Sequence, residues 1–467
     1  MKNAQKMDYA EFVGRKLSHI SPSGIAHPVD LPASLFDHQR ALTSWALKRG
    51  RSAIFADTGL GKSRMEVAWA DAVNKETGAP VLILAPLAVA VQTAQEAAQI
   101  GIHVQVCRDG SDVNDRGINI TNYDRLHRFN PAIFGGVVLD ESSIIKHHDA
   151  KTFGILTAAF AHTPYKLPAT ATPAPNDWTE LGTHAEFLGI CTRQEMLAEF
   201  FTHDGGDTSV WRLKGHARRE FWRWVVSWGA LIRRPSDLGY DDGAYALPPL
   251  HLHEHQVEVD MPTNGMLFAM EAQTLSERRD ARRMSMEDRV RDCAKRVNGE
   301  AGEPWVVWCD LNDESTALTQ AIDGAIEIRG SDDVDTKESR LQAFASGKAR
   351  VLVSKPSICG WGLNWQHSAR MAFVGVTDSY EAYYQAVRRC WRFGQKRDVH
   401  VHIFSSKAEG AVVANLKRKE REAAQMAESL SAETRDAVMA EVTGMTRQTN
   451  AHEAVKPVNV PAFLRAA

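Results

Sequence analysis

The stretch AIFADTGLGKSRMEVAWADAV, residues 53–73, decides the fold of this chain. Its first four residues form an apolar run that predicts a buried strand, a glycine-rich turn follows, and the remainder has the spacing of an amphipathic helix. The apolar positions of that helix are Met65, Ala68, Trp69, Ala72 and Val73. A strand, a glycine-rich loop and a helix in this order are typical of an α/β protein built around a parallel sheet.

The glycine-rich turn predicts a phosphate-binding loop. Glycines let consecutive backbone N–H groups point at one anion beside a helix N-terminus, while a lysine adds charge and a hydroxyl can ligate Mg²⁺. The residues expected to hold phosphates are Thr58, Gly59, Gly61, Lys62 and Ser63, with Ser63 also a metal ligand. Ala56 stands where the general pattern has its first glycine, which is tolerable if residue 56 has a negative φ. The alternative is an ordinary turn before a helix.

An acidic pair follows the apolar run of residues 135–139. Because α/β sheets place ligands at the carboxyl ends of their strands, Asp140 and Glu141 are expected at the same edge as the phosphate loop. We expect Asp140 to hold Mg²⁺ through water, and Glu141 to orient and deprotonate the attacking water. Alone, such a pair most often starts a solvated loop, but its position after Lys62 favours nucleotide hydrolysis.

Two arginines far along the chain complete the expected catalytic set. Arg389 and Arg392 are three residues apart on a predicted helix and would therefore share a face. Hydrolysis spreads negative charge over the transferred phosphoryl group, and an arginine placed there can accelerate it by about 10³–10⁵. Because these arginines belong to a different lobe from Lys62, we expect the site to be complete only when the lobes close. The alternative is a solvated basic face that includes Arg388.

The pattern of strands predicts an α/β fold with two lobes. Apolar runs alternate with helical or turn-rich stretches, as in parallel sheets covered by helices. The runs are 53–56, 81–86, 118–121, 137–140, 166–170, 305–309, 325–328, 351–354, 370–376 and 399–404. We expect lobe 1 at 1–245 with a helical insertion at about 187–234, lobe 2 at 246–455 with a helical segment at about 262–300, and a flexible tail at 456–467.

Composition indicates a soluble chain of two or three domains. At 467 residues the chain exceeds one ordinary core, and a net charge of −3 gives no overall attraction to a polyanion. Six scattered cysteines without a CxxC pair argue against a zinc site or disulfides and fit a reducing cytosol. The longest apolar run, 81–91, is well short of the roughly 20 residues that cross a bilayer. We expect a cytoplasmic protein of a bacterium or phage-infected host, without membrane association.

Six blocks in a fixed order resemble the motifs of superfamily 2 DEAD/DEAH-box helicases, and the Swi/Snf-like branch, with its small phage and bacterial members, fits best. The blocks are ADTGLGKS (56–63), APLAV (85–89), LDESSIIK (139–146), TATPAPN (170–176), GWGLNW (360–365) and QAVRRCWRFGQ (385–395). The resemblance spans about residues 35 to 405 and implies two RecA-like P-loop NTPase lobes with ATP and Mg²⁺ between them.

The resemblance also implies roles for single residues. Gln39 would contact adenine, Gln395 would lie at the lobe interface beside the nucleotide, and Thr170 and Thr172 would couple the ATP site to DNA. Four further motif positions are associated with the nucleic-acid track: Pro86, Thr121, Ser357 and Asn364. The sequence departs from the branch at Ser142-Ser143, where Ala-His or Ala-Asp is usual, which leaves the coupling role of that position open. It also departs at Trp391, where His is usual.

Other clusters allow two interpretations. The arginine-dense segments 211–234, which is also rich in tryptophan, and 278–296 either bind phosphates and bases or form core and solvated faces. His251, His253 and His255 alternate as on one face of a strand; without a matching carboxylate or cysteine cluster, they are expected to be exposed rather than metal ligands.

The leading hypothesis is an ATP hydrolase that translocates on DNA, with duplex DNA favoured. One alternative is a strand-separating DNA or RNA helicase, and another is a nucleotide-dependent DNA-binding clamp or adaptor with little turnover. A pure binder has no need of a water-activating carboxylate and two arginine fingers, which argues against the clamp, whereas Ser142-Ser143 keeps it open. The sequence does not choose among replication, repair and host–virus complexes for protein partners.

Overall fold

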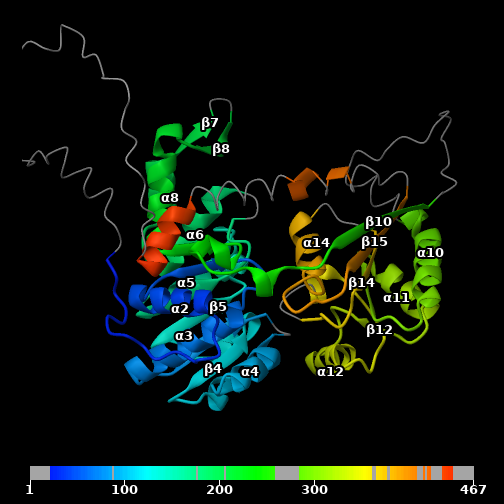
Figure 1. Cartoon of the computed structure of the whole chain (residues 1–467), viewed down its shortest axis with the longest axis horizontal. Helices are drawn as coiled ribbons and strands as arrows, with labels where there is room; N and C mark the ends of the chain where they lie inside the picture. Colours follow the sequence, from blue (N-terminus) through cyan, green and yellow to red (C-terminus); the bar gives the residue numbers. More distant parts are fainter. Residues whose placement is uncertain are drawn as a thin grey trace, which may run out of the picture.

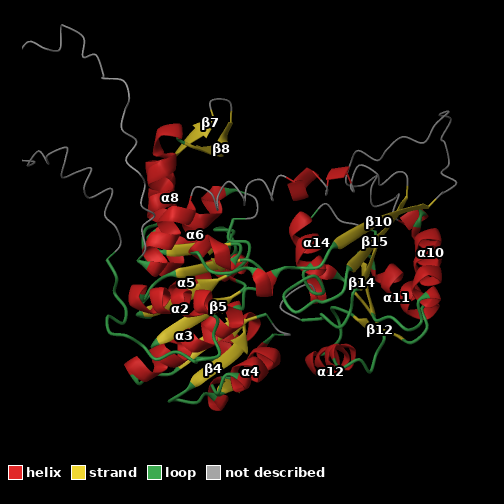
Figure 2. Ribbon diagram, viewed as in Figure 1, coloured by secondary structure: helices red, strands yellow, loops and turns green. Residues whose placement is uncertain are grey.

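Two parallel sheets, each with helices on both faces, form the two lobes of the computed structural model (Figures 1 and 2). The structure describes residues 21–86, 89–174, 177–204, 207–257, 283–359, 364–375, 379–406, 414–415, 418–421 and 434–444. The predicted α/β class with two RecA-like lobes is confirmed. Lobe 1, mainly blue to green in Figure 1, holds the phosphate loop, and lobe 2, which runs from the green strand at 250–257 through yellow to orange, holds the arginines.

Lobe 1 contains a sheet of seven parallel strands in the order β3-β4-β2-β5-β6-β1-β9. The strands are β1 (Ala53–Ala56), β2 (Val81–Ala85), β3 (Val104–Val106), β4 (Ile118–Asn122), β5 (Gly136–Asp140), β6 (Tyr165–Ala169) and β9 (Gly229–Ile232). The strands β1 and β5, which carry the phosphate loop and the acidic pair, are separated only by β6. Their carboxyl ends therefore meet at one edge of the sheet.

Helices cover both faces of this sheet. One hydrophobic core lies under α2 (Asp37–Arg49), α3 (Lys62–Thr77) and α4 (Ala90–Gln99). A second core lies under α5 (Lys151–Ala159), α6 (Leu181–Leu188), α7 (Arg193–Phe200) and α8 (Arg218–Val226). Trp69 of α3 is fully buried, as the helical spacing predicts.

The segment 187–234, expected to be helical, also contains strands. An antiparallel pair, β7 (Phe201–Asp204) and β8 (Asp207–Leu213), projects from lobe 1 above α8 (Figure 1). After α8 the chain returns to the sheet as β9, which pairs with β1. Trp222 and Trp228 are buried in the second core of lobe 1, so the interpretation of these tryptophans as core is correct.

Lobe 2 contains a sheet of six parallel strands in the order β10-β15-β14-β11-β13-β12. These strands are β10 (Leu250–Val257), β11 (Trp305–Cys309), β12 (Ala325–Ile328), β13 (Val351–Ser354), β14 (Arg370–Val374) and β15 (Val399–Ser406). Its helices are α10 (Met286–Gly299), α11 (Asn312–Ala321), α12 (Val334–Ala345), α13 (Pro356–Cys359) and α14 (Tyr380–Val387). Each face of the sheet packs a core of its own.

The three alternating histidines lie on β10, at the edge of this sheet. His253 and His255 are half-buried because each hydrogen-bonds a histidine of β15: His253 with His400 and His255 with His402, both at 2.9 Å. Only His251 is exposed, so the prediction that all three are exposed is wrong for the other two. No group of three His, Cys, Asp or Glu side chains in the described ranges could hold a metal ion.

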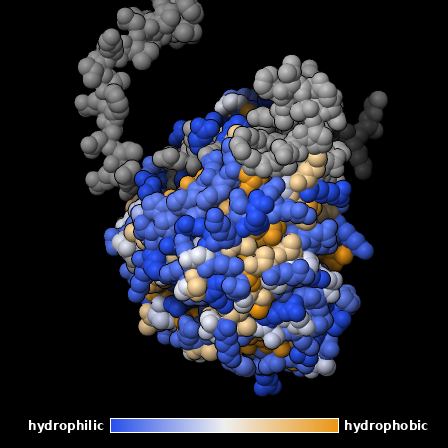
Figure 3. Space-filling view, turned by 90° about the vertical axis from the view of Figure 1, so that its right-hand side faces the viewer, coloured by the Kyte–Doolittle hydropathy of each residue, from blue (hydrophilic) through white to orange (hydrophobic). Residues whose placement is uncertain are grey.

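Residues 434–443, expected in lobe 2, form a helix that packs against lobe 1 instead. Val438 joins the lobe 1 core, Arg435 pairs with Asp237 at 3.0 Å, and Glu441 pairs with Arg49. The predicted tail at 456–467 and the arginines 278, 279 and 282 lie outside the described residues. Within the described part of the chain, no helix has the length and apolar character needed to cross a membrane. The surface viewed from the lobe 2 side is mainly hydrophilic with smaller apolar patches (Figure 3).

Candidate active site

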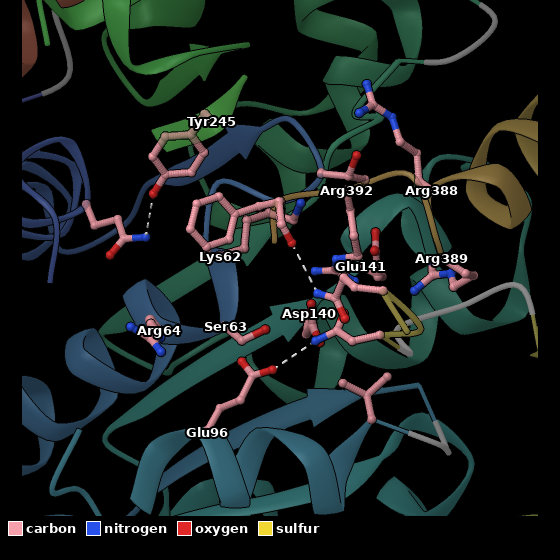
Figure 4. Close-up of a pocket in the computed structure, with 18 of the residues that line it drawn as sticks. Lys62, Ser63, Arg64, Glu96, Asp140, Glu141, Tyr245, Arg388, Arg389 and Arg392 are labelled. Atoms are coloured by element: carbon pink, nitrogen blue, oxygen red, sulfur yellow. Dashed lines mark hydrogen bonds between the residues drawn. The ribbon is translucent and has the colours of Figure 1, made fainter. Parts of the chain in front are cut away.

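A cavity of about 280 Å³ lies between the lobes. It is lined by every residue predicted to be catalytic or to bind the cofactor except Gln395. These lining residues are Gln39, Thr58, Gly59, Gly61, Lys62, Ser63, Asp140, Glu141, Arg389 and Arg392. Figure 4 shows Lys62, Asp140 and Glu141 of lobe 1 facing the same space as the arginines of lobe 2. Residues more than 300 positions apart in sequence are thus brought together.

The phosphate loop owes its shape to two glycines in the left-handed region. Gly59 has φ 89° and Gly61, directly before α3, has φ 81°, conformations that favour glycine. Both are also crowded: a Cβ on Gly61 would lie 2.2 Å from the Gln39 amide nitrogen, and one on Gly59 would lie 3.0 Å from the Phe393 backbone nitrogen. Ala56 is not among the described residues with positive φ, so the condition for replacing the first glycine is met.

Gln39 braces the phosphate loop. Its Nε2 donates to the carbonyl of Leu60 at 3.0 Å, and its Oε1 accepts from the Phe36 backbone N–H at 3.1 Å. Lys62 lies at the start of α3, and its Nζ donates to the carbonyl of Ala56 at 3.0 Å. The loop is therefore fixed from both α2 and β1, with Gln39 at the wall of the cavity, where contact with adenine remains a prediction.

The acidic pair lies at the end of β5, next to β6. Glu141 is the one non-glycine residue of the described chain with a positive φ, 54°, a strain of about 1–3 kcal/mol that is typical of functional positions. Thr170, at the end of β6, donates from its hydroxyl to Glu141 at 3.4 Å. Burial, together with the charge of Glu141, raises the pKa of Asp140 to about 7. A cation beside Asp140 would relieve that cost.

The residues present fit a magnesium ion held jointly with a nucleotide. Mg²⁺ in such sites takes one or two protein oxygens and completes its shell with phosphate oxygens and water. The Ser63 hydroxyl and the Asp140 carboxylate both line the cavity and supply those oxygens. Since the described residues offer no group of three ligands for a metal alone, the phosphates would have to contribute the rest.

The two predicted arginine fingers are not solvated. Arg389 is 3% exposed, and its guanidinium donates to the backbone and side-chain oxygens of Gln385 at 3.1 and 3.2 Å. Burial lowers the pKa of Arg389 to about 10, while the nearby charge of Glu141 acts in the opposite direction. Burial also lowers the pKa of Arg392, opposed by Glu96 and Glu141. The interpretation as an exposed basic face is therefore wrong.

The expected helix for these arginines is also wrong, because α14 ends at Val387. Arg389 and Arg392 lie in the turns that follow, where the Arg389 carbonyl accepts from the backbone N–H of Trp365 at 2.9 Å. Gln395 does not reach the cavity. Its amide donates to three backbone carbonyls within lobe 2, including that of Cys390 at 3.2 Å. Gln395 therefore stabilises the turn that carries Arg389 and Arg392, which we call the arginine turn, without lining the cavity.

A second hollow of about 490 Å³ opens between the lobes on the other side of Glu141, which lines both. Pro86 of lobe 1 and Ser357 of lobe 2, two of the predicted nucleic-acid positions, line it. The other two do not. Thr121 is 1% exposed, and its hydroxyl donates to the Cys107 carbonyl. Asn364 instead lines the first cavity, with Lys62 and the arginines.

Contacts across the lobes add residues that spacing did not indicate. Asn364 donates to Glu96 of α4 at 3.0 Å. Asp57 of the phosphate loop accepts from Tyr384 at 2.7 Å and pairs with Arg388 at 3.4 Å. Arg388 stood out beside Arg389, but no sequence rule links position 57 to position 388.

The departure at Ser142-Ser143 has a structural counterpart. Ser142 is fully buried and hydrogen-bonds Nε2 of His184 on α6 at 3.1 Å. Ser143 lines the second hollow. The residue after Glu141 is thus tied to a helix of the same lobe. In the sequence, the only sign of this contact was His184, a histidine among mainly apolar residues in the 181–188 segment.

Solved structures similar to this chain include an ATPase core bound to DNA. The SWI2/SNF2 ATPase core of Sulfolobus solfataricus in complex with dsDNA is similar to this chain with a TM-score of 0.41 and 17% sequence identity, over 89% of this chain and 98% of that chain. No protein-family model matches, and no curated protein matches. The description of the fold therefore depends on the two sheets and their helices.

Proposed function

We propose that this protein is a nucleic-acid-dependent ATPase that translocates on DNA, most simply on the duplex. One observation carries the proposal: the phosphate loop and acidic pair of lobe 1 line the same cavity as Arg389 and Arg392 of lobe 2. A cavity with one wall on each lobe changes shape when the lobes move. Hydrolysis there is accordingly coupled to movement of the lobes.

Each residue has a chemical task in this proposal. The loop N–H groups and Lys62 hold the β- and γ-phosphates, and Gln39 keeps the loop in shape. Ser63 and Asp140 would hold Mg²⁺, which neutralises phosphate charge when bound. Glu141 orients the attacking water and accepts its proton. Arg389 and Arg392 stabilise the charge that develops on the transferred phosphoryl group.

The second hollow supports a path for nucleic acid beside the ATP site. It is lined from both lobes and carries Lys146 on one side and Lys337 on the other, which suits contact with phosphates. Glu141 lines both this hollow and the nucleotide cavity. A ligand in the hollow can therefore alter the position of Glu141, and this gives a direct route from nucleic-acid binding to hydrolysis.

The test is steady-state ATP hydrolysis with duplex DNA, single-stranded DNA or RNA. We expect stimulation chiefly by the duplex. K62A should lower turnover by about 10²-fold or more and R392A by about 10³-fold or more. The matched control is K75A, since Lys75 is exposed on the same helix as Lys62 and pairs with Asp71 one turn earlier on that helix.

The outcomes separate the alternatives. Stimulation by RNA alone would overturn the assignment to DNA. Equal, negligible turnover by wild type, K62A and R392A would favour a nucleotide-dependent clamp. Strand separation of a tailed duplex, measured alongside, would identify a helicase rather than a translocase.

A further inference from the structure

Asp57 lies in the phosphate loop of lobe 1, but its carboxylate also accepts hydrogen bonds from lobe 2. Its backbone N–H donates to the Ile232 carbonyl at 3.0 Å, which fixes it to the end of β9. Its Oδ1 accepts from the Thr58 N–H and from the Tyr384 hydroxyl, both at 2.7 Å. Its Oδ2 faces Arg388 at 3.4 Å. A single carboxylate therefore connects the loop to α14 and to the turn after it.

Arg388 is held in place by two aromatic rings. The group lies 5.1 Å from the ring centre of Tyr384 and 4.6 Å from that of Trp391, distances at which a cation is attracted to an aromatic face. Trp391 is itself fixed, because its Nε1 donates to the Pro248 carbonyl in the linker between the lobes at 2.7 Å. Arg388 therefore cannot turn away from Asp57 without breaking these contacts.

Charge and burial make this contact stronger than an ordinary surface pair. The side chains of Arg388 and Asp57 are 11% and 19% exposed, so solvent screens them little. Burial acts to raise the pKa of Asp57, but Arg388 and Tyr384 outweigh it and hold that pKa below its ordinary value. Asp57 is thus ionised at neutral pH and pairs with a charged guanidinium.

The position of this contact relates it to catalysis. Arg388 directly precedes Arg389 and lies four positions before Arg392, and all three arginines lie in the turns after α14. Asp57 follows Ala56, whose carbonyl accepts from Lys62. The contact therefore lies between the two groups that must face one triphosphate. Lys62 and the arginines are carried by the chain segments that it joins.

We propose that Asp57, Tyr384 and Arg388 form a clasp that positions Arg389 and Arg392 against the phosphate loop. The inference rests on the proposed ATPase function and adds positioning residues to it. Tyr384 and Arg388 act through the two arginines that follow, and Asp57 provides the fixed point on lobe 1. Loss of the clasp lets the lobes meet with the arginine turn displaced, and displacements of about 1 Å cost about 10²-fold in rate.

Y384F is the sharpest variant, because it removes only the hydroxyl that crosses the lobes. We expect kcat for nucleic-acid-stimulated hydrolysis to fall by about 10-fold to 100-fold, with KM for ATP changed less than about twofold. The matched control is Y383F, one position earlier on α14, where the ring packs on Phe373 in the lobe 2 core. Y383F should hydrolyse ATP like wild type.

A double-mutant cycle tests the positioning role itself. In the R392A background the fingers are already disabled in part, so adding Y384F should lower kcat by less than about threefold. The same factor in both backgrounds would mean that Tyr384 acts independently of the fingers and would overturn the proposal. So would wild-type kinetics in Y384F.

A measurement of lobe geometry separates this proposal from the proposed function. Fluorophores at S111C on lobe 1 and S346C on lobe 2, both exposed, report the distance between lobes. Y384F should widen the distance distribution relative to wild type and Y383F. An unchanged distribution overturns the clasp whatever the activity. If Y384F widens the distribution but the wild-type protein shows no ATPase activity, the proposed function is refuted and the clasp remains as a contact between the lobes.

Discussion

Ser142 follows the strained Glu141 and holds it to lobe 1 through a buried hydrogen bond to His184. The His184 ring also lies 5.2 Å from Phe55 of β1, at 90°, so it links the acidic pair to the strand of the phosphate loop. Burial lowers the pKa of His184 to about 4, and the imidazole is therefore neutral at physiological pH. A neutral ring can bond the serine hydroxyl without a buried charge.

This bond predicts a stability coupling. S142A leaves Nε2 of His184 buried without a partner, so the free energy of unfolding should fall by about 1–3 kcal/mol in urea denaturation. H184L should cost less in the S142A background than in wild type, because the orphaned group is removed. Additive effects of the two changes would contradict this. S227A, at another buried serine whose hydroxyl bonds within its own helical turn, should be additive with H184L.

At the scale of single residues, short-range pattern predicted most of the residues that line the cavity between the lobes, but not the contacts that hold them in place. Asp140 ends β5, Glu141 follows it, and Lys62 begins the helix after β1, so their position at the sheet edge is set by the chain itself. Their contacts depend on which strands are neighbours and on how the lobes meet. The contact between Asp57 and Arg388 depends on the order of the strands and on how the lobes meet, and residue spacing predicts neither.

At the scale of elements, the paired strands β10 and β15 carry a stack of histidines. Rings of His251 and His400, His253 and His400, His253 and His402, and His255 and His402 lie 4.5–5.2 Å apart in near-parallel planes. Burial lowers the pKa of His402 to about 3, and it also lowers the pKa of the other half-buried rings. Arg296 and Arg370 add to this lowering, whereas Asp292, Glu300 and Asp398 oppose it.

The sign of the pH dependence follows from these lowered values. Above pH 6.5, the ordinary pKa of histidine, these side chains are neutral in both the folded and the unfolded protein. Below it they bind protons in the unfolded chain but stay neutral in the folded stack. Lobe 2 should lose stability as pH falls from about 6.5 toward 4, by about 1.4 kcal/mol per pH unit for each proton refused. Urea denaturation at several pH values measures the slope. H402Q should flatten it, and H162Q, at an exposed histidine of lobe 1, should not.

Elements were predictable where burial on both faces left an apolar run. Each of the ten predicted runs coincides with a strand to within two residues. The strands that lie outside them have other reasons to form. β3 has three residues, β10 is polar and depends on pairing with β15, and β9 follows a tryptophan-rich helix that dominates the local pattern. Tertiary pairing, rather than local preference, determines these strands.

At the scale of the whole molecule, the second hollow predicts a salt-dependent contact from both lobes. If Lys146 and Lys337 meet phosphates, K146A/K337A should lower the slope of log affinity against log salt by about two for duplex DNA. Fluorescence anisotropy over a salt series measures it. K75A, outside the hollow, should leave the slope unchanged, and an unchanged slope in the double variant would exclude this path.

The pairing of β9 with β1 has a mechanical consequence. The projecting hairpin β7-β8 leads through α8 into β9, which pairs with β1 at four positions and accepts the Asp57 N–H at its end. A force on that projection is transmitted through α8 and β9 to β1, the strand that leads into the predicted phosphate loop. If the protein translocates as proposed, an obstacle that pushes on the projection would change the rate of hydrolysis.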